Sequence, residues 1–238
     1  MSKKTSKART HYFAEAREYQ RVLEAEYNFF KGMQTAKNSI PGIPTIQKAL
    51  HDVTGFLQDR GRPLEVEVEF AVVDPRDRVT RSLLLGTQIR PPVTSGQAQA
   101  TYYLCLVQAD SILCKFHVDF DFCTDAVEKK PSPHVQFGGR VPPSLIKRAC
   151  KCSWNEALDK PRLPALPMCT PLLWHWAFLE YQHEEAMSAF LKSMSWKKLI
   201  KEAELAVLTP FFEDGQRFLR QHPERGLFNS FYTPVATV

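Results

Sequence analysis

Two short segments of the chain hold four polar residues whose types and spacing suit them for chemistry. The segment FHVDFDF, residues 116–122, carries His117, Asp119 and Asp121 at alternate positions, and HVQF at 134–137 adds His134. Alternate residues of a β-strand point to the same face, so the first three side chains would line up along one strand. If the two segments are neighbouring strands, two imidazoles and two carboxylates converge.

Imidazole and carboxylate groups together can bind a divalent metal or act as a general acid–base pair. One hypothesis is therefore a metal-dependent nuclease or related hydrolase that uses these four residues, with Arg162 as a phosphate clamp. Only this hypothesis requires a cofactor, the divalent metal. The other interpretation is a polar, solvated sheet face or a structural hydrogen-bond network. Aspartate is a poor strand former, however, so two aspartates in one strand need a reason.

The strands that would position these residues are predicted from apolar alternation and turn residues. Strands are expected at 64–70, 79–90, 101–108, 112–122 and 134–137, with turns at 74–77 and 109–110. Short connections between successive strands predict an antiparallel sheet. In the fourth strand the residues that alternate with the polar ones are expected in the core: Phe116, Val118 and Phe120. Glu65, Glu67 and Glu69 alternate in the first strand and are expected on its water-facing side.

Helices are predicted on both sides of the sheet. Residues 11–36 and 45–58 show helical periodicity, and a short helix is expected within 143–158. Thr170 followed by Pro171 predicts a helix start with a hydroxyl N-cap, and Ser195 and the pair Thr209-Pro210 predict two further starts.

The expected fold class is α+β, an antiparallel sheet of about five strands flanked by N-terminal and C-terminal helices. A flexible basic tail, 1–10, precedes a single domain, 11–238. That domain divides into helical 11–60, sheet 63–138, a proline-rich basic segment 139–169 and helical 170–225.

The positive charge is concentrated in two places. The formal net charge is +5, and the tail alone contributes Lys3, Lys4, Lys7 and Arg9. Without those four the chain has 27 basic and 26 acidic residues, so the body is nearly neutral. A second excess lies between residues 129 and 162. A nucleic-acid-binding module is therefore an alternative hypothesis, with phosphate contacts from the tail and from Arg140, Lys147, Arg148 and Arg162.

Several classes of protein are not expected. No run of 18 apolar residues exists, so no membrane span or membrane partner is predicted. The lysines at the N-terminus are not followed by an apolar segment, so no secretory signal is predicted. The six cysteines are expected to be reduced, in the cytoplasm. Cys150 and Cys152 lack the two-residue spacer of zinc knuckles, and Gly138-Gly139 does not have phosphate-loop spacing.

The segments PHVQFGGR and PRLPALPM, followed by an apolar helix, resemble a group of uncharacterised bacterial proteins. Those proteins share an H-x-Q-F-G-G strand end and a P-R-x-P-x-x-P-M loop, and the match covers about residues 110–185. More loosely, the chain is similar to small toxin and phage-defence families whose sheet carries a D/H strand followed by a histidine strand. The resemblance implies a bacterial accessory or defence context. It also implies an acidic residue after Met168, where this chain has Cys169.

The favoured hypothesis is a non-catalytic interaction subunit of a bacterial defence or toxin-type multiprotein system, with other protein subunits as partners. It depends on the apolar helix at 172–181, where Trp174 and Trp176 are the candidate partner-binding residues, on the aromatic C-terminus and on the lack of a complete catalytic signature. The hydrolase and the nucleic-acid-binding module remain as alternatives.

Overall fold

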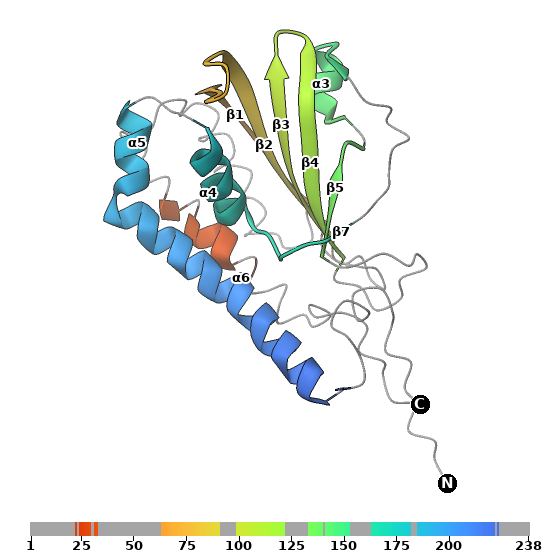
Figure 1. Ribbon diagram of the computed structural model, residues 1–238, viewed down its shortest axis with the longest axis vertical. Coiled ribbons are helices and arrows are strands. Elements are labelled where there is room, and N and C mark those ends of the chain that lie inside the picture. The colour runs from red at the N-terminus through yellow and green to blue at the C-terminus, as the bar shows by residue number, and fades with distance from the viewer. Residues whose placement is uncertain are drawn as a thin grey trace.

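The computed structural model shows an α+β protein with an antiparallel sheet and flanking helices, which confirms the expected fold class (Figure 1). It describes residues 22, 24–29, 31–32, 63–90, 99–121, 133–139, 141–152, 163–181, 185–221 and 223. For a few of these, Phe120 and Asp121 among them, it describes the backbone but not the side chain.

The sheet is built from five strands of four or more residues, all of them predicted: β1 Leu64–Val73, β2 Thr80–Arg90, β3 Gln99–Gln108, β4 Ser111–Asp121 and β5 His134–Phe137. The order is β1-β2-β3-β4-β5-β7, where β7 is Leu163–Pro164, and the two-residue β6, Lys151–Cys152, pairs with β4 in parallel. Neighbours in chain order are therefore neighbours in space up to β5, as short connections favour.

The two predicted turns lie where the chain reverses. Asp74 directly follows β1 and accepts hydrogen bonds from the backbone N–H of Arg76 at 3.0 Å and from its guanidinium at 2.9 Å. Arg81 of β2 also contacts this carboxylate at 2.8 Å. The β3–β4 turn needs a positive φ of 50° at Ala109, and the two strands pair from Gln108 and Ser111 to Gln99 and Asp121, with one shift of register between Leu106 and Val107.

One face of the sheet is covered by helices α4, Thr170–Glu180, and α6, Met194–Gln221, with α5, Glu185–Lys192, beside them (Figure 1). An aromatic core fills this layer, in which Trp174 packs edge-on against Phe29, at a centroid distance of 5.2 Å, and against Phe70. Val118 is buried there and Phe116 packs against its edge, which confirms the predicted orientation of these two residues. The side chain of Phe120 lies outside the described part of the chain.

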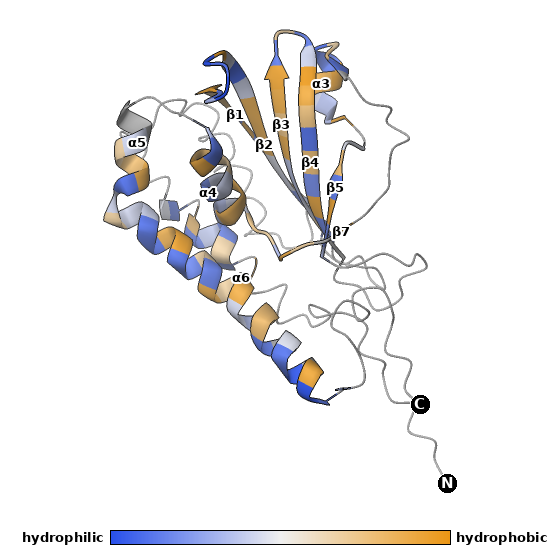
Figure 2. Ribbon diagram, in the orientation of Figure 1, coloured by the Kyte–Doolittle hydropathy of each residue, from blue (hydrophilic) through white to orange (hydrophobic). Residues whose placement is uncertain are grey.

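The opposite face is apolar only near the β3–β4 turn, where the short helix α3, Pro143–Lys147, covers it. Leu145 and Val141 pack there on Tyr103 and Cys105. The rest of this face is polar, and Figure 2 shows hydrophilic bands on β4 where β5 runs beside it. The helix expected within 143–158 is thus present, and it ends at Lys147.

The start of α4 differs from the prediction. Cys169 is the N-cap, in an extended conformation, and Thr170 is already the first helical residue. The backbone N–H of Thr170 donates to Oε1 of Glu26 at 2.7 Å, and its hydroxyl pairs with that of Thr87 at 2.7 Å. A buried carboxylate from residues 24–29, a helical segment inside the predicted 11–36, therefore caps the helix in place of a threonine hydroxyl.

The prediction that Thr209-Pro210 starts a helix is wrong, because α6 continues through both residues. A proline inside a helix costs about 3 kcal/mol. Burial of Val207 and Phe211 on the same helix offsets that cost. Ser193, and not Ser195, caps α6, since its hydroxyl accepts the backbone N–H of Trp196 at 3.2 Å.

Three predicted segments lie outside the described residues: the basic tail 1–10, the helix 45–58 and the aromatic C-terminus. Among the described helices, none is both long and apolar enough to cross a membrane.

Candidate functional site

Strand register brings together three of the four candidate residues. Asp119 lies opposite His134 on β5, and His117 lies opposite Gln136. Thr101 of β3 lies opposite Asp119 on the other side. Directly opposed residues of antiparallel strands share a face, so the polar side chains form a row across the sheet. Asp121 lies opposite Gln99 at the end of the pairing, and its side chain is outside the described part of the structure.

Asp119 is at the centre of this group. Its Oδ1 accepts the Thr101 hydroxyl at 2.6 Å, and its Oδ2 lies 3.4 Å from Nε2 of His117 and 3.5 Å from Nε2 of His134. Burial raises the pKa of Asp119. At the acid pH where a carboxyl titrates, imidazoles ordinarily carry a positive charge. There the hydrogen bond and charge of His117, the Thr101 hydrogen bond and the charge of His134 together lower the pKa of Asp119 by more, so it settles at about 2. The carboxylate is therefore ionised at neutral pH.

Lys115 engages the other side of the His117 ring. Its Nζ lies 3.3 Å from His117 Nδ1 and donates to the carbonyl of Gly138 at 2.8 Å. Because an ammonium group can only donate, Nδ1 accepts and the ring proton is on Nε2, which faces Asp119. Both nitrogens of His117 are thus occupied, and neither presents a lone pair to a substrate or a metal.

Two glycines leave room for ring side chains on this face of the sheet, one for His117 and one for Tyr103. A Cβ on Gly139, where φ is +75°, would lie 3.1 Å from His117 Cε1, so glycine lets the loop after β5 close over the imidazole. A Cβ on Gly86 would lie 1.9 Å from Cζ of Tyr103. The Tyr103 ring occupies that space and donates its hydroxyl to Glu67 at 2.7 Å. Glu67 is therefore part of a structural contact with Tyr103.

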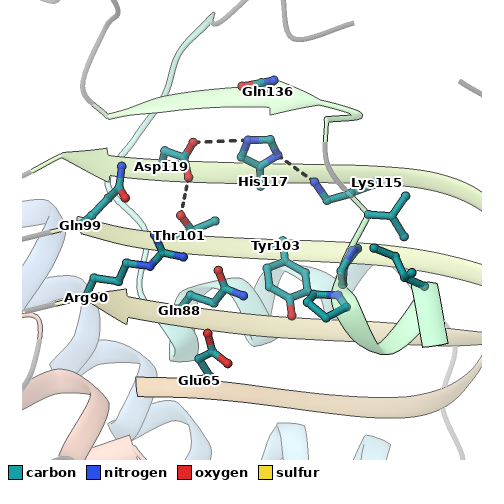
Figure 3. Close-up of a pocket in the computed structure, with 14 residues that line it drawn as sticks. Glu65, Gln88, Arg90, Gln99, Thr101, Tyr103, Lys115, His117, Asp119 and Gln136 are labelled. Atoms are coloured by element: carbon teal, nitrogen blue, oxygen red, sulfur yellow. Dashed lines mark hydrogen bonds and ion pairs between the residues drawn. The ribbon is translucent and has the colours of Figure 1, made fainter. Parts of the chain in front are cut away.

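A pocket of about 680 Å³ lies on this face (Figure 3). Its floor spans the five main strands, and its end wall is formed at the start of α3. The residues that line it are Glu65, Gln88, Arg90, Gln99, Thr101, Tyr103, Lys115, His117, Asp119, Gln136, Val141, Pro142, Pro143 and Ile146. The lining is polar and of mixed charge along the strands and apolar at the wall.

The two sides of the pocket differ in how their side chains are used. On the β4 side, Lys115, His117 and Asp119 are joined by the contacts given above. On the β1–β2 side, the side chains of Glu65, Gln88 and Arg90 make no hydrogen bond or ion pair within the part of the chain that the structure describes. Sequence reasoning missed Gln88 and Arg90. The available signal was their alternation at the polar end of an otherwise apolar strand.

Metal-binding geometry is not found among the described residues, since no three or more histidine, cysteine, aspartate or glutamate side chains are arranged to hold an ion. Cys105 and Cys169 are buried free thiols. Burial raises the pKa of both, so they are neutral and unreactive at physiological pH.

The candidate nucleic-acid contacts are mostly outside the described residues: Lys3, Lys4, Lys7, Arg9, Arg140 and Arg162. Lys147 is exposed at the end of α3. Arg148 is paired with Glu69, at 2.9 Å between Nη1 and Oε2, so its charge is compensated within the protein.

The two candidate partner-binding tryptophans have different positions. Trp174 is 1% exposed in the core and is not available to a partner, which corrects that part of the prediction. Its helix is apolar on nearly every side, so periodicity does not show which face is buried. Trp176 is 41% exposed and its ring packs edge-on against Phe116, at a centroid distance of 4.7 Å.

Comparison of the chain with protein-family models, with curated proteins and with solved structures gave no match.

Proposed function

We propose that the protein is a non-catalytic interaction subunit of a bacterial defence or toxin-type multiprotein system. The observation that carries the proposal is a partly exposed aromatic surface where α4 meets the edge of the sheet. Trp176 is 41% exposed and Phe137 of β5 is 64% exposed. Phe116 links them, since it packs on Trp176 and lies opposite Phe137 in the strand register. We call these three residues the aromatic edge.

Exposed aromatic side chains of this kind are typical of protein interfaces, where they contribute a large contact area at low entropic cost. Leu163 of β7 extends the aromatic edge, because it pairs with Val135 and is 44% exposed. The bacterial accessory or defence context is what the resemblance of residues 110–185 to a group of uncharacterised bacterial proteins implies.

The state of the histidine cluster supports a non-catalytic function. A general base needs a free lone pair within reach of its substrate, and both nitrogens of His117 are occupied by protein groups. His134 is 1% exposed, so a substrate cannot reach it in this conformation.

The test is affinity purification of the tagged full-length protein from its native genomic context, with quantitative mass spectrometry. We expect Trp176→Ser and Phe137→Ser to lose co-purifying subunits. Phe212→Ser is the matched control, since Phe212 is a 51% exposed aromatic residue of α6 that does not belong to the aromatic edge. Partners that are retained equally by all three variants would contradict the proposal.

A second candidate is the hydrolase, favoured by one observation. His117 and His134 both approach the same oxygen of Asp119, at 3.4 and 3.5 Å. The assay is nuclease activity with Mg²⁺ or Mn²⁺ on single- and double-stranded substrates. Activity that is lost in His117→Ala and Asp119→Asn, with folding retained, would establish this candidate and remove the first one.

A further inference from the structure

The β1–β2 side of the pocket has polar groups that the protein itself does not use. Arg90, Gln88 and Glu65 occupy neighbouring positions of two paired strands. Figure 3 shows the Arg90 side chain extended over the sheet toward the middle of the pocket. None of the three side chains makes a hydrogen bond or ion pair within the described part of the chain, so all three are available to a ligand.

Arg90 determines the charge of that ligand. A guanidinium group presents planar paired donors that match a carboxylate or a phosphate. The other cation of the pocket, Lys115, already donates to Gly138 and contacts His117. Arg90 is therefore the position where an anionic group would bind.

The acidic residues add a second requirement. Asp119 is an ionised carboxylate on the floor and Glu65 is exposed on the rim. Carboxylates only accept hydrogen bonds, so the part of the ligand that lies beyond its anionic group must donate. Hydroxyl or amine groups meet this requirement, whereas a bare anion would be repelled by the floor.

The far wall is apolar and the volume is that of a small molecule. Pro143 and Ile146 line this end, and Ile146 is 61% exposed. The pocket, about 680 Å³, lies within the range of about 300–1,000 Å³ that is usual for small-molecule sites. A carbon skeleton can pack on this wall while the polar groups face the strands.

We propose that the pocket binds a small organic anion rich in hydroxyl groups, such as a phosphorylated or carboxylated sugar. Arg90 binds the anionic oxygens, Gln88 and Asp119 bind the hydroxyl groups, and Pro143 and Ile146 contact the carbon skeleton. The network of Lys115, His117 and Asp119 holds the floor in place. This site is separate from the aromatic edge, and its test does not depend on any protein partner.

The test is isothermal titration calorimetry on the full-length protein with four probes. Ribose 5-phosphate and gluconate each carry an anionic group and hydroxyl groups, and they distinguish a phosphate from a carboxylate. Inorganic phosphate lacks the hydroxyl-bearing skeleton and ribose lacks the anion. We expect saturable binding of at least one complete probe, at least about tenfold tighter than that of either partial probe, which is a modest gain for an added charged hydrogen bond. No binding of either complete probe at about 10 mM, a concentration that would reveal even millimolar affinity, overturns the proposal.

Variants assign the binding to this pocket. Arg90→Gln should lower the affinity for the complete probe by at least about tenfold. Arg78→Gln, at an exposed arginine of the β1–β2 turn, should leave binding unchanged. Gln88→Glu adds a negative charge beside Arg90 and should also weaken binding. Thermal melting of each variant confirms that it is folded. Equal binding by wild type, Arg90→Gln and Gln88→Glu would show that any observed binding occurs elsewhere and would overturn the proposal.

Discussion

The carboxylate of Glu26 accepts the backbone N–H of Thr170 at 2.7 Å, so an acid buried in the core caps a helix that begins 144 residues further along the chain. Burial raises the pKa of Glu26, and hydrogen bonding from Thr170 only partly opposes it, so the pKa is about 7. Cys169, the N-cap residue, lies close by as a neutral thiol.

The first prediction is that stability falls as the pH rises because of Glu26. Its pKa is about 7 in the folded protein against 4.5 for an ordinary glutamate, so the folded state binds the proton more tightly. Its contribution is fully present below pH 4.5 and is lost as the pH rises through 7. The loss amounts to about 3 kcal/mol. Glu26→Gln should remove this dependence and raise stability at pH 8.

Urea denaturation between pH 4 and pH 8 measures this effect. Glu24→Gln is the control, since Glu24 lies on the same helical segment and is exposed. A Glu26→Gln variant that keeps the wild-type pH dependence would show that another group causes it.

The second prediction concerns Asp119, whose linkage has the opposite sign. Its folded pKa of about 2 lies below the ordinary 3.8, so its stabilising contribution is present above pH 3.8 and is lost as the pH falls toward 2. Asp119→Asn should lower the free energy of unfolding by about 2 kcal/mol at pH 7. It should also reduce the dependence of that free energy on pH between 3.8 and about 2. Glu65→Gln, on the pocket rim, should do neither. An acid unfolding curve of Asp119→Asn that matches wild type would contradict the prediction.

The third prediction tests the contact between Gly86 and Tyr103. Alanine at position 86 would put a Cβ 1.9 Å from Cζ of Tyr103, so the ring must move and its bond to Glu67 is lost. Gly86→Ala should therefore cost about 1–3 kcal/mol in guanidinium denaturation. In a Tyr103→Val background the same change should cost much less, because the clash is gone. An equal loss of stability from Gly86→Ala in both backgrounds would show that the clash with Tyr103 is not its cause.

The fourth prediction concerns the loop after β5. Lys115 donates to the carbonyl of Gly138, so Lys115→Met should loosen residues 138–139 and increase their hydrogen exchange, with a stability loss of about 1–3 kcal/mol. Lys147→Met, at an exposed lysine of α3, is the control. Unchanged exchange in Lys115→Met would mean that the backbone bond from Gly138 N–H to the Lys115 carbonyl holds the loop by itself.

Local patterns in the sequence are sufficient to predict the strands and their turns. Period-two alternation predicts which side chains share a strand face, because successive residues must point in opposite directions. This alternation by itself places His117 and Asp119 on one face of β4, and Phe116 and Val118 on the other. The turn at 74–77 is equally local, because proline and aspartate restrict the backbone within a few residues.

Long-range relationships are decided only by the tertiary structure. The pairing of Asp119 with His134 depends on the register of a separate strand, which local propensity does not specify. Burial of Trp174 and exposure of Trp176 depend on which face of a nearly all-apolar helix meets the sheet. The hydrogen bond from Thr170 to Glu26 joins residues that are 144 positions apart in the chain. The local sequence around either residue therefore does not predict it. Pro210 stays within α6 because packing of the buried face outweighs a local helix-breaking preference.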